Sequence, residues 1–270
     1  MKKILVFLMF MLGFLSANSL NEIKSSKILR VGVFEAQPPF SQIKENGEFE
    51  GFEVDLAKEI AKKIFGGNSG TIEFKPVLAS DRLKVLQNNE IDFLIATFTI
   101  TDERSKVIDF SNPYFAVNIG VVTRKDDGIK TFADLKGKTI IAEHGTTGEV
   151  YFRNQGFNIL GCDGAANCYK MLKNTPDAAG YASDNTIVLT YAVIDKSLEV
   201  NINSLGASDF LGIGVQKGNK ELLNIINDEL IQLSKEGYFK KLFDNQINTF
   251  YHGLADKKYF LLDDIYKFFL

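Results

Sequence analysis

The chain has 270 residues, of which 45% are hydrophobic, so it can fill one large or two ordinary globular cores. Its 31 basic and 34 acidic side chains give a formal net charge of −3 and leave no broad basic surface. This composition excludes nucleic acid and anionic membrane faces as favoured partners, so any ligand must be recognised locally.

The N-terminal residues have the pattern of a secretory signal peptide. Two lysines precede an apolar run from Ile4 to Leu15, which is shorter than the roughly 20 residues of a membrane-spanning helix. Small residues follow, and either Leu15-Ser-Ala17 or Ala17-Asn-Ser19 fits a cleavage site. We expect residues 1–19 to be the signal peptide. The mature protein should be periplasmic and free of a lipid anchor, because no cysteine lies near these sites.

The next part of the chain alternates between strands and helices. The expected elements are a strand at 28–34, a helix at 55–64, a strand at 71–77, a short helix at 80–87 and a strand at 91–96. Pro38-Pro39 follows the first strand, and Gly66-Gly67 ends the first helix. Because parallel neighbours need a crossover connection, this alternation predicts a parallel sheet covered by helices.

A second set of elements repeats the pattern from residue 119 onward. Strands are expected at 119–123, 138–142, 158–160, 178–183 and 211–216, and helices at 131–135, 148–154, 165–174, 185–193 and 222–233. No Pro-rich or Ser-rich linker separates the two sets. They therefore predict two α/β lobes joined by continuous strands, with a ligand-binding cleft between them. A further amphipathic helix is expected within residues 251–270, packed back on a lobe.

Cys162 and Cys168 are the only cysteines. Export to an oxidising compartment favours a disulfide between them, with two free thiols as the alternative. The bridge would close a short loop and add little to stability. Because no histidine or further cysteine lies near this pair in the sequence, it makes a poor zinc site. We expect no metal and no cofactor.

Familiar catalytic motifs are absent from the sequence, which contains no Gly-x-Ser-x-Gly, phosphate loop or His-Glu-x-x-His. The segment from Ile95 to Arg104 is more informative, because it follows a buried strand and has hydroxyl side chains at positions 97, 99 and 101. Backbone N–H groups, hydroxyls and Arg104 could together clamp a carboxylate at this strand end. The alternative is that Thr101 caps a short helix and Arg104 is solvated.

A known family shares the order and spacing of five segments: Gly51-Phe-Glu-Val-Asp-Leu-Ala, Ala96-Thr-Phe-Thr-Ile-Thr-Asp-Glu-Arg104, Asp109-Phe-Ser-Asn-Pro-Tyr114, Gly145-Thr-Thr147 and Ala182-Ser-Asp184-Asn. Over residues 28–244 the chain resembles the polar amino-acid binding proteins of ABC importers, solute-binding protein family three. It is most similar to the branch with cysteine- and aspartate/glutamate-binding members.

The resemblance implies the type II periplasmic binding protein fold. This is an α/β architecture of two lobes, each a mostly parallel sheet flanked by helices, joined by two hinge strands. Lobe 1 would comprise residues 20–116 and 213–270, and lobe 2 residues 117–212, with hinges near 116–120 and 211–214. The lobes would close on a free amino acid, and the closed form would be presented to a membrane permease.

Site residues also follow from the resemblance. Arg104 would pair with the ligand α-carboxylate, helped by Thr99 and by Thr147 from the other lobe. Asp184 would face the α-ammonium, so that opposite charges on two walls bind a zwitterion best when the cleft is shut. The alternative for Asp184 is to cap the helix that begins near Asn185. Further lining positions match Thr97, Phe98 and Thr146.

Three positions bear on the ligand side chain. Phe34 stands where binders of basic amino acids have an acidic residue, which disfavours lysine and arginine. Gln37 falls on the usual aromatic lid position, which suggests a polar side chain. Arg82 matches an arginine that contacts the side-chain carboxylate in aspartate/glutamate binders, but the lysine that aids it there is absent, and cysteine-binding relatives have the same arginine. We therefore rank cysteine or an acidic amino acid first and glutamine next.

Capture of a polar amino acid for import, by a monomer and without catalysis, is the function that the sequence favours. One alternative is a periplasmic enzyme similar to cyclohexadienyl dehydratases, which share the architecture. Another is a sensor that reports its ligand to a separate membrane receptor.

Overall fold

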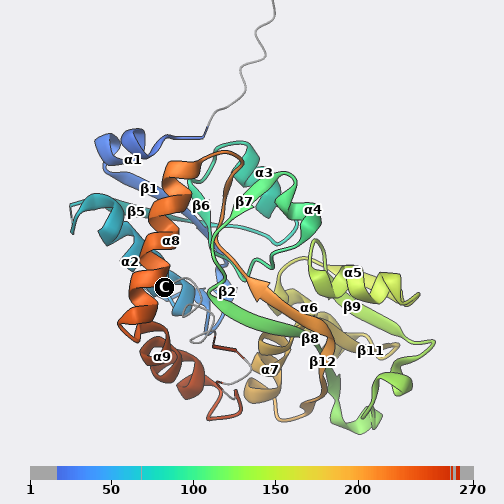
Figure 1. Cartoon of the computed structure of the whole chain (residues 1–270). Helices are drawn as coiled ribbons and strands as arrows, with labels where there is room; N and C mark the ends of the chain where they lie inside the picture. Colours follow the sequence, from blue (N-terminus) through green and yellow to red (C-terminus); the bar gives the residue numbers. More distant parts are fainter. Residues whose placement is uncertain (1–16, 68, 256, 258–259, 262–270) are drawn as a thin grey trace, which may run out of the picture.

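The structure is a computed structural model that describes residues 17–67, 69–255, 257 and 260–261. The apolar run of the expected signal peptide and most of the expected C-terminal helix lie outside these residues. Within them the chain forms two lobes, each built on a five-stranded sheet with helices beside it (Figure 1). The predicted α/β class is confirmed. No helix among the described residues is both long and apolar enough to span a membrane.

Lobe 1 is built on a sheet with the strand order β5-β1-β6-β13-β7. The first three of these strands are parallel, and β13 is antiparallel to both of its neighbours. The strands are β1 (Ile28–Val33), β5 (Thr71–Pro76), β6 (Phe93–Leu94), β7 (Ile108–Phe110) and β13 (Gly214–Gln216). The helices are α1 (Leu20–Ser26), α2 (Phe52–Phe65), α3 (Arg82–Gln87), α4 (Asp102–Ser105), α8 (Lys220–Lys235), α9 (Tyr238–Leu242) and the π-helical η3 (Phe243–Asn248). A small sheet adds β2 (Ala36–Gln37), β3 (Ser41–Ile43) and β4 (Phe49–Glu50).

Lobe 2 repeats this arrangement with the strand order β10-β9-β11-β8-β12. Again the first three strands are parallel and the fourth is antiparallel to its neighbours. The strands are β8 (Phe115–Arg124), β9 (Thr139–Glu143), β10 (Asn158–Cys162), β11 (Ala178–Asp184) and β12 (Leu198–Leu211). The helices are α5 (Thr147–Asn154), α6 (Ala165–Asn174) and α7 (Asn185–Ile194), with 3-10 turns η1 (Lys125–Asp127) and η2 (Phe132–Leu135).

Helix α2 illustrates how the sequence produces these elements. Gly51 precedes it with φ 128°, and a Cβ at this position would lie 2.3 Å from the Phe40 carbonyl oxygen, so the chain passes here only without a side chain. Apolar residues then recur at helical spacing, and Leu56 and Ile60 are fully buried against the sheet. Gly66 ends the helix in the left-handed conformation.

Two antiparallel strands connect the lobes. Strand β8 begins at Phe115 and pairs with β12, whose last residue, Leu211, is the partner of Phe115. Strand β12 is a long element that the sequence analysis did not predict. Its side chains alternate between apolar and polar only from Leu198 to Asn203, and Gly206 interrupts the remainder. Its hydrogen bonds to β8 continue the strand beyond Asn203, where the side chains no longer alternate. The expected strand at 211–216 is limited to Gly214–Gln216.

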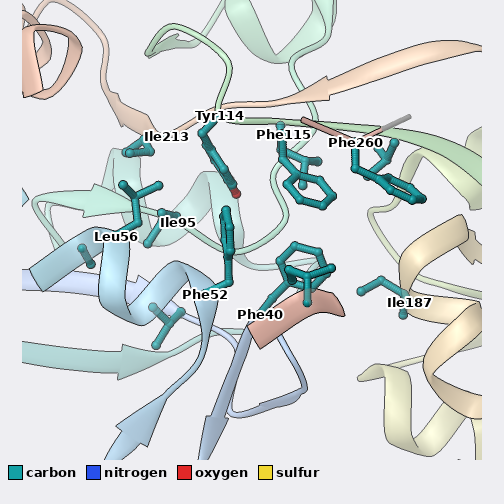
Figure 2. Packing of buried hydrophobic residues seen from close by; sticks show 14 of the residues in the cluster. Phe40, Phe52, Leu56, Ile95, Tyr114, Phe115, Ile187, Ile213 and Phe260 are labelled. Atoms are coloured by element: carbon teal, nitrogen blue, oxygen red, sulfur yellow. The ribbon is translucent and has the colours of Figure 1, made fainter. Parts of the chain in front are cut away.

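Aromatic rings pack beneath this connection (Figure 2). The Phe115 ring lies 5.3 Å from that of Phe40, 5.5 Å from Phe52 and 5.7 Å from Phe260, measured between centroids. Ile187 on α7 of lobe 2 belongs to the same buried cluster. The hydrophobic core is therefore continuous between the lobes behind the cleft.

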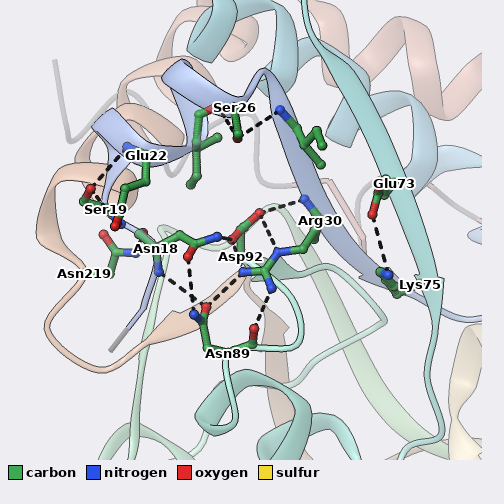
Figure 3. A network of polar contacts seen from close by, with 12 residues as sticks. Asn18, Ser19, Glu22, Ser26, Arg30, Glu73, Lys75, Asn89, Asp92 and Asn219 are labelled. Atoms are coloured by element: carbon green, nitrogen blue, oxygen red, sulfur yellow. Dashed lines mark hydrogen bonds and ion pairs between the residues drawn. The ribbon is translucent and has the colours of Figure 1, made fainter. Parts of the chain in front are cut away.

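A polar network holds the first described residues against lobe 1 (Figure 3). The Arg30 guanidinium pairs with Asp92 at 2.6 Å and donates to the Asn89 backbone oxygen. The Asn18 side chain donates to Asp92, and the Asn18 carbonyl accepts from Asn219 at 3.1 Å. Next to it, Ser19 and Glu22 form a capping box at the start of α1. Asn18 and Ser19 are thus integral parts of the fold.

The two cysteines lie on neighbouring elements of lobe 2. Cys162 ends β10, Cys168 lies in α6, and the two side chains form a disulfide. Both residues are buried against the core. The bridge fixes the loop between the strand and the helix.

Candidate ligand-binding site

Side chains from both lobes line a cavity of about 10 Å³ between the two sheets, close to the smallest volume that holds one water. Lobe 1 contributes Phe34, Gln37, Arg82, Thr97 and Thr99, and lobe 2 contributes Glu143, Thr146, Thr147, Ser183 and Asp184. The walls touch, so an amino acid can enter only if the lobes separate.

Arg82 is held in place by the backbone of lobe 1. Its Nε donates to the Ala79 carbonyl at 3.0 Å, and its Nη1 donates to the carbonyls of Ala96 and Thr97 at 3.0 and 3.3 Å. The side chain is 3% exposed. Burial lowers the pKa of this guanidinium, against the raising effect of Glu143 and Asp184. Its neutral hydrogen-bond partners leave a positive charge in the cavity wall.

Arg104 approaches the cavity from the end of the Thr97–Thr101 loop. Its Nη1 donates to the Thr99 carbonyl at 2.6 Å. Burial and the nearby Arg82 lower its pKa to about 9, against the opposing effect of Asp184. Phe98 supports both arginines, since its ring centroid lies 4.8 Å from the Arg82 guanidinium carbon and 4.7 Å from that of Arg104. Phe98 is thus a buried support for the two cations.

Both arginines reach across the cleft to one atom of lobe 2. Arg82 Nη2 donates to the Gly145 carbonyl at 3.0 Å, and Arg104 Nη2 donates to the same oxygen at 2.8 Å. Gly145 has φ 77°, and a Cβ there would lie 2.9 Å from the Ala79 oxygen and 2.9 Å from Ser80 Cα. The absence of a side chain therefore lets the two lobes meet at this point. A ligand carboxylate would be a stronger acceptor for the same two cations than this neutral carbonyl.

Asp184 lies on the lobe 2 wall at the end of β11 and is 8% exposed. It occupies the N-cap position of α7, but its side chain makes no capping hydrogen bond. Burial raises its pKa to about 7, and the positive charge of Arg82 opposes this rise. The carboxyl group is thus close to both arginines and is not used by the helix.

Thr97 is held in a conformation that is rare for a β-branched residue, with φ 37°. Its N–H donates to Glu53 Oε1 at 2.7 Å, and its hydroxyl accepts from Gln37 at 2.8 Å. Glu53 is fully buried, also accepts from the Tyr114 hydroxyl, and its Oε2 has no partner among the described residues. Burial raises the pKa of Glu53 to about 7. Glu53 therefore fixes the turn that presents Thr97 and its carbonyl to the cavity.

The other lobe 2 residues of the wall surround the start of α5. Thr146 caps this helix by accepting from Glu149 N at 3.2 Å, and its hydroxyl donates to the Glu143 carbonyl. Thr147 is the first residue of the helix. Glu143 is 3% exposed, and its Oε1 accepts from Gly164 N at 3.0 Å. Burial raises the pKa of Glu143, and Arg82 opposes the rise.

Eight of the ten residues that the sequence assigned to the site line this cavity. Arg104 adjoins it through Thr99, and Phe98 lies beneath the arginines. Thr101 does cap α4 by accepting from Arg104 N, while the Arg104 side chain turns towards the cleft. The sequence analysis did not identify Gly145 as an acceptor or the buried acidic residues Glu53 and Glu143.

A larger hollow of about 960 Å³ lies on the outer side of lobe 1, between the small sheet and η3. Lys58 and Asp55 line it and form an ion pair with each other at 2.9 Å. Both side chains are also well exposed. Because its charges are mutually satisfied and hydrated, this hollow lacks the converging charges of the interlobe cavity.

Comparison with known proteins agrees with this geometry. The model of the bacterial extracellular solute-binding proteins, family 3, matches residues 29–248. The chain belongs to this family. The solute-binding protein is 32% identical over 206 residues to the ABC transporter glutamine-binding protein GlnH of Bacillus subtilis, covering 75% of this chain and 74% of the relative. Its two sheets with flanking helices are those of the two-lobed type II fold of this family.

Two solved structures are similar over nearly their whole length. One is a solute receptor for L-cysteine of Neisseria gonorrhoeae, with TM-score 0.85 and 31% identity, covering 90% of the solute-binding protein and 99% of the receptor. The other is a cysteine-binding protein of Campylobacter jejuni, with TM-score 0.85, 31% identity and coverage of 90% and 98%. These likenesses extend across both lobes.

Proposed function

We propose that the solute-binding protein is the substrate-binding component of an ABC amino-acid importer. It captures a polar amino acid between its lobes, closes, and presents the closed form to a membrane permease. Cysteine and aspartate or glutamate are the favoured ligands, followed by glutamine. The names of the similar proteins reported above support cysteine and glutamine within this range.

The observation that carries the proposal is the convergence of Arg82 and Arg104 on one carbonyl oxygen, with Asp184 on the opposite wall. An α-carboxylate beside that carbonyl would receive charge-assisted hydrogen bonds from the remaining N–H groups of Arg104. The ammonium of the same ligand would then face Asp184. An amino-acid head group has both charges at a fixed separation, so it can satisfy both walls only in the closed form.

Isothermal titration of the purified protein with each of the twenty amino acids tests this function. The protein is first unfolded in denaturant, dialysed and refolded, so that any carried ligand is removed, and circular dichroism verifies the fold. We expect saturable heat with one or a few polar amino acids and none with most others. Twenty titrations without heat on folded protein would refute the proposal.

Two further assays, one with the purified protein and one with cells, test the alternatives. Turnover of prephenate or arogenate would support a dehydratase-like enzyme, whereas the proposal expects no loss of either compound. A sensor would leave amino-acid uptake intact when its gene is deleted, whereas the proposal expects uptake to fall.

Size-exclusion chromatography should give the mass of a monomer. We also propose lobe limits of 20–116 with 213–270 and of 117–212.

We infer export to the periplasm through a cleaved signal peptide, with cleavage between Ala17 and Asn18. Cleavage there keeps the Asn18 contacts to Asp92 and the Ser19 capping box, whereas cleavage after Ser19 removes both. Loss of such a cap costs about 1 kcal/mol. Intact-mass analysis of the secreted protein should therefore give a chain that begins at Asn18. A chain that begins at Leu20 would contradict this choice.

A further inference from the structure

The donors of Arg82 limit what this residue can bind. Nε and Nη1 of the guanidinium are already occupied by the carbonyls of Ala79, Ala96 and Thr97. Only Nη2 points across the cleft, where it donates to Gly145. A carboxylate on a ligand side chain forms its strongest pair with an arginine through two neighbouring nitrogens. Arg82 can offer one nitrogen, so it is poorly arranged to grip a second carboxylate.

A buried acid on the other lobe is available to balance the charge of Arg82. Glu143 lines the same cavity from the end of β9 and is almost completely buried. Its Oε1 accepts one backbone hydrogen bond, from Gly164. Among the charged groups, Arg82 has the largest effect on the pKa of Glu143, and Glu143 has the largest effect on the pKa of Arg82. The cavity separates these two opposite charges.

The charged side chains that line the cavity, together with the adjoining Arg104, can be assigned in two pairs. Arg104 and Asp184 suffice for the carboxylate and the ammonium of an amino-acid head group. Arg82 and Glu143 remain, one on each wall, and together they are neutral. A negative ligand side chain between them would be repelled by Glu143 and a positive one by Arg82, so the attraction to the other residue of the pair is offset and the cost of removing the ligand charge from water is not repaid. Both kinds of side chain are costly in a site that excludes water.

The small size of the site also favours a ligand with a short side chain. The closed cavity has a volume of about 10 Å³, and its walls are fixed by the hydrogen bonds of Arg82, Thr97 and Thr146. A long side chain in the cavity would prevent Arg82 and Arg104 from forming their hydrogen bonds to the Gly145 carbonyl. A short side chain therefore needs a smaller displacement of the walls than a long one.

We propose that the ligand is a small amino acid with an uncharged side chain of thiol or hydroxyl size, and that Glu143 excludes acidic amino acids. This inference rests on the proposed function and narrows it to cysteine-like ligands within the range given above. Glu143 acts as a specificity-determining residue, and Arg82 serves as its counter-charge across the cavity.

Competition titrations with cysteine, serine, aspartate and glutamate test the inference. The wild-type protein should bind cysteine or serine at least about a hundredfold more tightly than aspartate, because like charges across a buried interface cost several kcal/mol. Glu143→Gln should raise the affinity for aspartate relative to cysteine by about tenfold or more. Glu199→Gln removes a carboxylate of lobe 2 that lies outside the cavity and pairs with Lys130, so this control should leave the ratio unchanged.

Several outcomes separate this inference from the proposed function. If no amino acid binds, the proposed function itself fails. If aspartate or glutamate binds the wild-type protein more tightly than cysteine and serine, only the inference fails, and this result needs no variant. An unchanged ratio in folded Glu143→Gln, or an equal change in Glu199→Gln, would also overturn it.

Discussion

Gly145 offers a sharp test of how the lobes close. A Cβ at this position would lie 2.9 Å from both the Ala79 oxygen and Ser80 Cα, whereas ordinary contacts of this kind are about 3.5–4.0 Å. Gly145→Ala therefore forces the facing walls apart by roughly half an ångström. The hydrogen bonds from Arg82 and Arg104 to the Gly145 carbonyl would lengthen accordingly from 3.0 and 2.8 Å.

The expected magnitude follows from those two hydrogen bonds. A hydrogen bond with a charged donor contributes about 1.5–3 kcal/mol, so weakening both should cost the closed form about 2 kcal/mol. This corresponds to a dissociation constant about thirtyfold higher. The positive φ of an alanine at this position adds a separate cost of about 1–2 kcal/mol, which the open and closed forms share. That second cost lowers stability and leaves affinity unaffected.

Gly156→Ala is the matched control. Gly156 has φ 78°, nearly the same as the 77° of Gly145, but a Cβ there would meet nothing within 4 Å. Both variants should lose similar stability in urea unfolding, and only Gly145→Ala should lose affinity by titration. Small-angle scattering should show less contraction on ligand binding in Gly145→Ala than in the wild type. Equal affinities of the two variants would refute the reasoning.

Three further predictions concern the cavity wall. The pKa of Glu53 is raised from 4.5 to about 7 in the folded protein, so the folded state binds a proton that the unfolded state releases between these values. Its stability penalty is absent below about pH 4.5 and complete above about pH 7, which amounts to about 3 kcal/mol. Urea unfolding from pH 8 to pH 5 should therefore show rising stability. The rise should be smaller in Glu53→Gln but not absent, because burial also raises the pKa of Asp184 to about 7. An identical rise in the two proteins would contradict this assignment. Arg104→Ala should lose about 2–5 kcal/mol of binding free energy with little change in stability, and equal losses of both would instead assign the residue to the helix capped by Thr101. Phe98→Leu should weaken binding about five- to thirtyfold, since each guanidinium loses about 0.5–1 kcal/mol of interaction with the ring, and an affinity equal to that of the wild type would exclude this support.

The sequence predicted the elements whose side chains alternate between core and solvent. Helix α2 has apolar residues at regular helical spacing, and Leu56 and Ile60 are fully buried as that pattern requires. Strand β12 was not predicted, since its side chains alternate only from Leu198 to Asn203 and the rest of the strand is ordered by backbone pairing with β8. Of the two strands that connect the lobes, the sequence analysis therefore predicted part of β8 and missed β12.

The candidate site was predictable to a similar extent. Thr99 and Arg104 follow a buried strand, and their residue types indicate carboxylate binding before any fold is known. Gly145 takes part through a backbone oxygen, which no side-chain pattern can reveal. Glu53 and Glu143 are acidic residues in ordinary surroundings along the chain, and only their burial in the folded protein distinguishes them.

The contact that shuts the cleft uses a main-chain atom of lobe 2. Its acceptor is a backbone atom, and its donors are the side chains of Arg82 and Arg104. Residues such as Gln37 and Glu143 line the cavity but take no part in this contact. Redesign of such a receptor for another nutrient, or as a biosensor, can therefore exchange wall residues such as Gln37 and Glu143 and retain the closing motion, provided that Arg82, Arg104 and Gly145 are kept.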